Sequence, residues 1–334
     1  RLRAARLLWA RVLTAYGLGQ NEAKGIFWSR TSWWNKTVYD PYVNLLRTTT
    51  EAMAAAVGGA DAITVLPFDN TYRPAEEFSR HLARNTQTIL KHEAWLDRVA
   101  DPSGGSWYVE RLTESIAKEA WKLVQEVEVQ GGYRAAADAI QAAVEKSRAS
   151  KEAAIGSRRR SLLGTNQYPN AKEQVLAELK ADNTGKPRRG AEVIEQIRLT
   201  TERSGKAPVF LLAECGDVKM RKARSGFVGA FFGCAGFALN TRSFDTPGAI
   251  VEAVLTNRPA AVVLCSSDDE YLALGQSVLD GLKAAGNTTP VLIAGLPKDA
   301  TEALTAAGVA DFIHIRTNPV ETLTRWQQKL GVRG

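Results

Sequence analysis

Apolar and polar positions alternate with a helical period in the first part of the chain. Residues 1–16 place aliphatic side chains on one face, as an amphipathic helix does. Residues 41–57 repeat the pattern behind Asp40, a natural N-cap. Between these helices, the aromatic-rich residues 25–39 predict a strand and a loop, and the apolar run ADAITVLPFD (60–69) predicts a buried strand. A strand, a helix and an apolar strand in this order are typical of the end of a barrel of parallel strands.

A long helical pattern follows between residues 75 and 150. It is broken by the turn-forming residues DPSGG (101–105), and the polar loop TNQYPN (165–170) ends the region. Residues 171–203 are polar and carry glycine, proline and arginine, which is typical of a linker with some helical character.

The last part of the chain has a different pattern, in which short apolar runs alternate with helical segments. The runs are VFLLAE, FALNT, AAVVLCSS, PVLIAG and DFIHI, and helices are predicted to begin near Val218, Pro247, Glu270, Lys298 and Pro319. Five strand–helix units predict a doubly wound parallel sheet of flavodoxin-like topology. Ligands of such sheets bind beyond the carboxyl ends of the strands. The segment CGDVKMRKARSGF (215–227) follows the first strand and is therefore a candidate ligand loop.

The predicted fold class is α/β, with four segments along the chain. They are the C-terminal part of a TIM-type (β/α)8 barrel (1–74), a helical segment packed on the barrel (75–170), a linker (171–203) and the flavodoxin-like domain (204–334).

Composition narrows the function classes only slightly. The 334 residues are 45% hydrophobic and 24% charged, as in ordinary globular proteins, and carry a net charge of +7. That charge suits an acidic partner subunit or a phosphate-bearing ligand such as a coenzyme A ester. The basic residues are scattered, so we expect no nucleic-acid binding. Three cysteines without metal-ligand spacing indicate reduced thiols in the cytoplasm, and no apolar run is long enough to span a membrane.

Four stretches carry a resemblance to a known family. They are DPYVNLLRTTTEAMAAAVGGADAITVLPFD, EEFSRHLARNTQTIL, DPSGGSWYVERLT and GTNQYPN. In these stretches the chain resembles the methylmalonyl-CoA mutases, which are adenosylcobalamin-dependent acyl-CoA mutases. TVLPFD and GTNQYPN look most like the small subunit of the heterodimeric bacterial enzyme. The chain begins inside a helix and without Met, so we expect it to be a fragment that lacks an N-terminal part.

The resemblance implies a cobalamin-type domain at the C-terminus, but the family's motif is degenerate here. Catalytic chains read Asp-x-His-x-x-Gly, then Ser-x-Leu, then Gly-Gly, with the His on cobalt and the Asp orienting it. A gap-free alignment back from GFAL puts the Asp, His and Gly positions on Lys219, Arg221 and Arg224. Arginine has no lone pair to give to a metal. In the Ser-x-Leu motif, Ser266 is retained but an Asp replaces the Leu. Gly295 is the one glycine present at the Gly-Gly pair.

The predicted barrel part also lacks residues that the family's catalytic chains carry. Where catalytic chains read His-Ser-Gln-Thr-Ser, this chain reads WSRTS from Trp28 to Ser32. Where they read Gln-Ser-Leu-His-Thr-Asn, it reads DAITVL from Asp61 to Leu66. By resemblance those polar side chains point toward the substrate, and a bulky Trp28 and an apolar Leu66 are poor replacements for them.

Several conspicuous residues have plainer explanations. The basic residues from Lys219 to Arg224 are interpreted as a solvated turn. The alternative is that they bind an anion or a partner protein at the start of a helix. The helical segment that begins at residue 75 carries ARNTQ and two histidines eleven residues apart, which is too far for one metal site along an intact helix. DPSGG lacks the lysine and the spacing of a phosphate loop. The tryptophans near residue 30 are expected in a core or a subunit interface. We predict no catalytic residue and no metal site in this chain.

The leading hypothesis is a catalytically silent small subunit of a methylmalonyl-CoA mutase heterodimer. By resemblance, a large catalytic subunit would hold the adenosylcobalamin and the acyl-CoA and would interconvert methylmalonyl-CoA and succinyl-CoA in the cytoplasm. Two alternatives stay open from the residues alone. One is a divergent mutase that is active without a protein cobalt ligand, and the other is an anion-binding regulatory module that uses Lys219, Arg221 and Arg224.

Overall fold

The computed structural model describes residues 1–19, 21–180 and 186–333. The chain forms two compact units, each treated by itself below. Unit 1 holds Arg1–Lys36, Pro41–Lys151 and Lys180–Arg189, and unit 2 holds Thr37–Asp40, Glu152–Leu179 and Gly190–Gly334. Both units contain parallel strands and helices, so the predicted α/β class is confirmed. None of the helices in the described ranges is both long and apolar enough to span a lipid bilayer.

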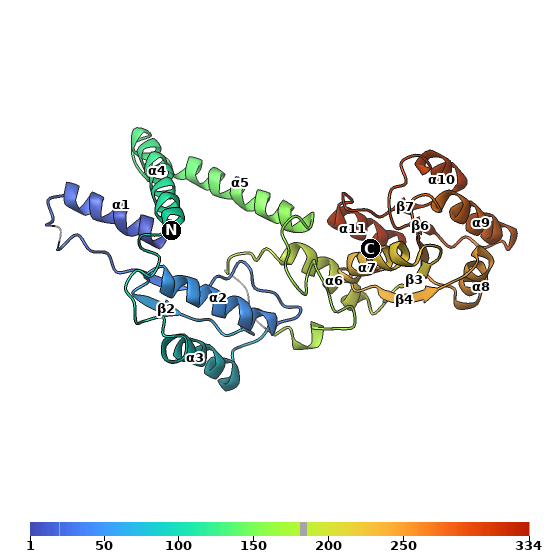
Figure 1. The fold of residues 1–334 in the computed structure, drawn as a ribbon, viewed down its shortest axis with the longest axis horizontal. Coiled ribbons are helices and arrows are strands. Elements are labelled where there is room, and N and C mark those ends of the chain that lie inside the picture. The colour runs from blue at the N-terminus through green and yellow to red at the C-terminus, as the bar shows by residue number, and fades with distance from the viewer. Residues whose placement is uncertain (20, 181–185, 334) are drawn as a thin grey trace. The chain divides into compact units, whose positions relative to one another are not determined.

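Unit 1 is mainly helical and contains one pair of short strands (Figure 1). Its elements are α1 (Leu2–Ala15), β1 (Trp28–Arg30), α2 (Val43–Val57), β2 (Ala62–Thr64), α3 (Glu77–His92), α4 (Trp107–Val129) and α5 (Ala137–Gly156), the last of which continues into unit 2. Parallel β1 and β2 pair from Trp28–Ala62 to Arg30–Thr64. Two strands do not close a barrel, so the TIM-type barrel stays a prediction.

The two faces of the β1–β2 pair have different surroundings. Ile63 packs against the apolar cluster that Ala52 of α2 and Ala83 of α3 help to form. Successive side chains of a strand point to opposite faces. Ala62 and Thr64 therefore belong to the other face, together with Trp28 and Arg30, which pair with them in the sheet. Trp28 on that face is 70% exposed. This is the face that would line the inside of a barrel.

Unit 2 contains one five-stranded parallel sheet. Its elements are η1 (Leu176–Glu178), α6 (Glu192–Ser204), β3 (Val209–Glu214), α7 (Val218–Gly233), β4 (Ala238–Ser243), α8 (Pro247–Asn257), β5 (Ala261–Cys265), α9 (Tyr271–Ala284), β6 (Val291–Ile293), α10 (Thr301–Ala307), β7 (Asp311–Phe312) and α11 (Pro319–Lys329). The strand order β4-β3-β5-β6-β7 is that of flavodoxin-like doubly wound sheets.

Alternating side chains of β3 divide the core of unit 2 between the two faces of the sheet. Phe210 and Leu212 belong to a cluster with residues of α6, α7 and α11, including the buried Trp326. Leu211 and Ala213 belong to a second cluster with residues of α8, α9 and α10. Helices therefore cover both faces (Figure 1), which explains why these strands read as continuous apolar runs rather than as alternating ones.

Three details differ from the sequence predictions. Asp40 is not the N-cap of α2, because α2 begins at Val43 and Tyr42 occupies the cap without a side-chain hydrogen bond. The predicted strand 60–69 is paired only over Ala62–Thr64. The predicted linker contains α6, whose Ile194 is buried in the core of unit 2. The sequence-based domain limits stay predictions, although unit 2 takes in residues from 190 onward.

Candidate functional site

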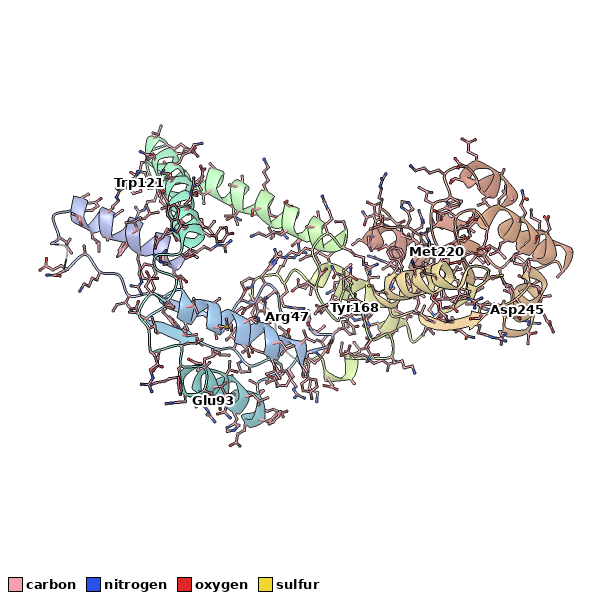
Figure 2. All side chains as sticks on the ribbon, in the orientation of Figure 1. Arg47, Glu93, Trp121, Tyr168, Met220 and Asp245 are labelled. Carbon is pink, nitrogen blue, oxygen red and sulfur yellow. The ribbon has the colours of Figure 1, made fainter. Side chains whose placement is uncertain are left out.

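The carboxyl edge of the unit 2 sheet is the first candidate site. β3 ends at Glu214 and β5 at Cys265, and these two strands are neighbours in the sheet. The chain leaves β3 toward α7 and leaves β5 toward α9, so the two loops lie beside each other. α7 begins behind Asp217, whose carboxylate accepts the backbone N–H of Met220 (labelled in Figure 2) at 2.7 Å. This is the place where ligands of doubly wound sheets bind.

Glu214 is the most enclosed charge at this edge. Its side chain is only 2% exposed and accepts three hydrogen bonds. The donors are Nζ of Lys222 at 2.6 Å, Oγ of Ser225 at 2.6 Å and Oγ of Ser243 at 2.7 Å. Burial raises the pKa of Glu214, but these bonds outweigh burial and lower the pKa to about 2. Glu214 is therefore ionised at neutral pH and its carboxylate oxygens are engaged inside the protein.

Glu270 closes the neighbouring loop in a similar way. Its carboxylate accepts hydrogen bonds from Oγ of Ser266 and from the backbone N–H groups of Ser267 and Asp217. Hydrogen bonds from the two serines lower the pKa of Glu270 to about 2. Gly216 adopts a φ of +78°, and a Cβ atom there would lie 2.2 Å from a carboxylate oxygen of Glu270. A glycine is required because Glu270 fills the space beside the loop.

The residues at the degenerate motif positions are partly brought together. A guanidinium nitrogen of Arg224 lies 2.8 Å from a carboxylate oxygen of Asp268. Both side chains lie against Gly295, where a Cβ atom would come within 3.1 Å of Arg224 and 3.2 Å of Asp268. Gly295 itself has a φ of +154°. The space that a glycine leaves beside the backbone at this point is occupied by the Arg224–Asp268 ion pair.

The remaining predicted positions lie on either side of this pair. Ser266 is fully buried, and its Oγ lies 2.7 Å from the carbonyl oxygen of Cys215, which shares the one hydroxyl hydrogen with Glu270. Lys219 is exposed in the first turn of α7. Among the described residues, the Arg221 side chain reaches only the carbonyl oxygen of Gly216, at 3.5 Å. Of the five residues at the degenerate motif positions, the structure brings Arg224 and Gly295 into contact. Ser266 instead forms hydrogen bonds within the loop beside Glu270.

These residues do not fit a bound corrinoid. The sequence resemblance predicts Arg221 at the position of the family's cobalt ligand, and its guanidinium has no lone pair. The space around Gly295 is taken by an ion pair whose disruption would leave the carboxylate of Asp268 without its partner. We therefore assign no step of a cobalamin reaction to this chain.

The strand ends of unit 1 form the second candidate site. On the barrel-inside face, Nε1 of Trp28 donates to Oγ1 of Thr64 at 2.9 Å, which fixes the indole across both strands. Oγ1 of Thr31 accepts the backbone N–H of Leu66 at 2.9 Å. Asp61 lies at the amino end of β2 and binds the backbone N–H of Phe27. Hydrogen bonds from Trp28 to Thr64 and from Leu66 to Thr31 therefore join the two strands and the loops that follow them.

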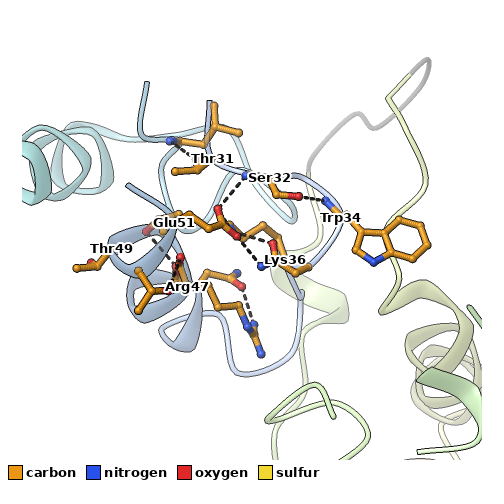
Figure 3. Close-up of polar contacts among 12 residues, drawn as sticks. Thr31, Ser32, Trp34, Lys36, Arg47, Thr49 and Glu51 are labelled. Carbon is orange, nitrogen blue, oxygen red and sulfur yellow. Dashed lines mark hydrogen bonds and ion pairs between the residues drawn. The ribbon is translucent and has the colours of Figure 1, made fainter. Parts of the chain in front are cut away.

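A polar cluster follows the carboxyl end of β1 and is centred on Glu51 of α2 (Figure 3). Glu51 accepts the backbone N–H of Ser32 at 2.8 Å, Nδ2 of Asn35 at 2.5 Å and Nζ of Lys36 at 2.9 Å. The Lys36 side chain is 4% exposed. Burial lowers the pKa of Lys36, although Glu51 raises it in part. Each of these groups binds Glu51, and Trp34 points away from them in Figure 3.

Sequence reasoning missed Glu214, Glu270 and Glu51, which organise these clusters. Glu214 ends an apolar run and reads as the last residue of a strand. Glu51 lies within a helical pattern. The only available signal was Gly216, because a glycine directly after a strand often marks a close approach of another group.

The comparisons with known proteins agree with the sequence resemblance. The model of the family described as methylmalonyl-CoA mutase matches residues 1–218. The chain is 44% identical, over 100% of its length and 56% of that protein, to a methylmalonyl-CoA mutase small subunit of Porphyromonas gingivalis. It is 34% identical, over 99% of its length and 54% of that protein, to the small subunit of Streptomyces virginiae.

A large subunit is also related to this chain. The methylmalonyl-CoA mutase large subunit of Porphyromonas gingivalis is 32% identical over 66% of the chain and 31% of that protein. The chain spans about half the length of the small-subunit relatives that it matches. The family match over residues 1–218 and the whole-chain identity to the small subunits lead to one conclusion: the chain belongs to the methylmalonyl-CoA mutase family.

Proposed function

We propose that this chain is part of the small subunit of a heterodimeric methylmalonyl-CoA mutase. In this proposal a large-subunit partner holds adenosylcobalamin and acyl-CoA and interconverts methylmalonyl-CoA and succinyl-CoA. This chain supplies a related but silent counterpart that stabilises the active chain. The small-subunit relatives, with 33–44% identity over nearly the whole chain, support this assignment. A cytoplasmic location is part of the same proposal.

One observation carries the claim that this chain leaves cobalamin to its partner. Arg224 and Asp268 form an ion pair against Gly295 at the carboxyl edge of the unit 2 sheet, and Arg221 stands where a cobalt ligand would be needed. Hydrogen bonds to the carboxylates of Glu214 and Glu270 hold the neighbouring loops in place without a ligand. An edge that is already filled by its own side chains does not need a cofactor to be stable, and the guanidinium of Arg221 cannot bind cobalt.

The test uses the full-length small subunit, the large subunit of the same organism, and their co-expressed complex. Each sample is incubated with adenosylcobalamin in the dark, separated from free cofactor by gel filtration, and examined for corrinoid absorbance and for mutase activity. We expect cofactor and activity in the complex and no corrinoid on the small subunit alone. Stoichiometric corrinoid on the isolated small subunit, or turnover by it, would refute the proposal.

A further inference from the structure

A short segment of irregular backbone, Thr37–Asp40, is buried in unit 2. We call it the strap. Thr37, Val38 and Tyr39 are at most 1% exposed, so residues of this chain already cover them. The residues on either side of the strap, Lys36 and Pro41, belong to unit 1. The chain therefore leaves unit 1, passes through unit 2 for four residues and returns to unit 1.

Carboxylates of unit 2 bind the backbone of the strap. Buried backbone that forms neither a helix nor a strand must find other partners for its N–H groups. The N–H of Val38 donates to a carboxylate oxygen of Glu195 at 2.7 Å, and the N–H of Asp40 donates to Glu173 at 2.8 Å. Carboxylates are stronger acceptors than carbonyl groups, so a few contacts are enough to hold this segment.

Tyr39 is the central side chain of the strap. Its hydroxyl group donates to Glu202 at 2.5 Å, and the guanidinium of Arg198 lies 4.0 Å from the centre of its ring. Burial and the carboxylate of Glu202 raise the pKa of Tyr39, so the hydroxyl group keeps its proton. The other oxygen of Glu202 accepts the backbone N–H groups of Val175 and Leu176, each at 3.1 Å. Glu202 therefore joins the strap to a second loop of unit 2.

The strap explains the polar composition of α6. Glu195, Arg198 and Glu202 follow one another at spacings of three and four residues and share one face of this helix. Glu195 is 1% exposed and Arg198 is 2% exposed. Ile194 and Ile197 lie on a neighbouring face and pack into the apolar core of unit 2. The charged face of α6 is thus an interior surface, and the strap lies against it.

The loop that contains GTNQYPN (164–170) also holds the strap. Gly164 has a φ of +77°, and a Cβ atom there would lie 2.4 Å from Cβ of Asp40. Asp40 itself has a φ of +48°. Arg198 donates to the carbonyl oxygens of Asn170 at 2.5 Å and of Glu173 at 2.7 Å. A glycine is required at position 164 because the strap and this loop are in close contact.

The residues just before the strap are held separately within unit 1. Nζ of Lys36 donates to Glu51 at 2.9 Å (Figure 3), and the carbonyl oxygen of Lys36 accepts a hydrogen bond from Arg189 at 3.0 Å. The whole connection from β1 to α2, residues 31–42, contains no helix or strand. It is fixed at two places, the Glu51 cluster and the strap. Release of one of them returns conformational freedom to the connection and weakens the hold of the other.

We propose that the strap is a latch: while it is docked against α6, it also holds the β1–α2 connection of unit 1, so that the two places open together. Opening of the strap in unit 2 would then reach the Glu51 cluster at the carboxyl end of β1, which is the second candidate site. The alternative is a passive crossing, in which opening of the strap stays within unit 2. The latch does not depend on the proposed function.

The experiment measures hydrogen exchange by mass spectrometry in the full-length subunit, with overlapping peptides that separate residues 32–36 from residues 37–40. Tyr39→Phe removes the hydrogen bond to Glu202 and keeps the ring beside Arg198. Glu202→Gln weakens the same bond from the other partner. The matched control is Tyr42→Phe, because Tyr42 is 63% exposed and phenylalanine keeps the ring that stacks on Phe68. Thermal melting verifies that each variant is folded, and Glu202→Gln decides the question if Tyr39→Phe does not fold.

We expect Tyr39→Phe to speed exchange about tenfold at residues 37–40 and at Val175 and Leu176, as the loss of one hydrogen bond to a charged group predicts. Residues 32–36 of unit 1 should speed up by a similar factor. Glu202→Gln should act in the same direction. The strand β5 (Ala261–Cys265) should stay within about twofold in every variant, and the Tyr42→Phe control should stay within about twofold at all of these positions.

Two results would overturn the latch. Faster exchange at residues 37–40 with unchanged exchange at residues 32–36 would show a passive crossing. Unchanged exchange at residues 37–40 in both variants, or an equal effect of Tyr42→Phe, would show that Glu202 does not hold the strap. Both results would leave the assignment as a mutase small subunit standing, because that assignment is tested by corrinoid binding and activity.

Discussion

Replacing Glu214 by glutamine tests whether the carboxyl edge of the unit 2 sheet is held together by its own charges. Glutamine has the same shape, so the hydrogen bonds with Ser225 and Ser243 can be kept in a weaker, neutral form. The ammonium group of Lys222 loses its charged partner. The Lys222 side chain is 62% exposed and can be hydrated again, which limits the loss.

The magnitude can be worked out in two ways. Hydrogen bonds to a charged group contribute roughly 1.5–3 kcal/mol, and neutral ones about 1 kcal/mol, so weakening three of them at a partly hydrated site costs about 2 kcal/mol. A pKa that falls from 4.5 to about 2 corresponds to roughly 3 kcal/mol in favour of the charged form. Solvent around Lys222 lowers this second figure, so both routes lead to about 2 kcal/mol for Glu214→Gln.

The assay is pulsed hydrogen exchange along a urea series, read on peptides that contain β3. With a slope of roughly 2 kcal/mol per molar urea, the midpoint for β3 should fall by about 1 M. Glu252→Gln, an exposed substitution on α8 of the same unit, serves as control and should leave the midpoint unchanged. The reasoning is wrong if the Glu214→Gln midpoint stays within about 0.2 M of the unsubstituted chain.

The pH dependence of the same transition carries a definite sign. Glu214 has a folded pKa below its unfolded value, so its contribution is complete above about pH 4.5 and is lost as the pH falls toward 2. The stability difference between the unsubstituted chain and Glu214→Gln should therefore shrink over that interval. A difference that stays constant down to pH 2.5 would show that the carboxylate charge is not its source.

Two further predictions concern unit 1 and the cysteines. Lys36→Met should lower the urea midpoint of α2 peptides by about 0.5–1 M, because Glu51 then keeps a partly buried charge without its cation, and Lys36→Met/Glu51→Met should recover part of that loss. An unchanged midpoint in the single variant would contradict this. Burial raises the pKa values of all three cysteine thiols, that of Cys234 to about 11. With Ellman's reagent at pH 7.5, the folded chain should react on the order of 100-fold more slowly than the unfolded chain, and rapid reaction of one thiol in the folded chain would disprove it.

Residue patterns along the chain were sufficient to predict most helices and the strands of unit 2. Four of the five apolar runs contain an observed strand and the fifth overlaps β4. The strands β3, β5 and β6 read as apolar because both faces of the sheet are covered there. The same patterns placed the candidate site at the edge where Arg224 and Gly295 meet. The local signal failed for residues 192–204, where a polar composition concealed α6 and its buried Ile194.

By itself, the sequence also determined that the side chain of residue 221 cannot bind a metal, because an arginine has no lone pair in any fold. Only the tertiary structure decided what fills the edge instead. Glu214 meets Ser243 across 29 positions of sequence, and Arg224 meets Asp268 across 44. Which face finds a partner depends on contacts between distant segments, and local periodicity does not encode them.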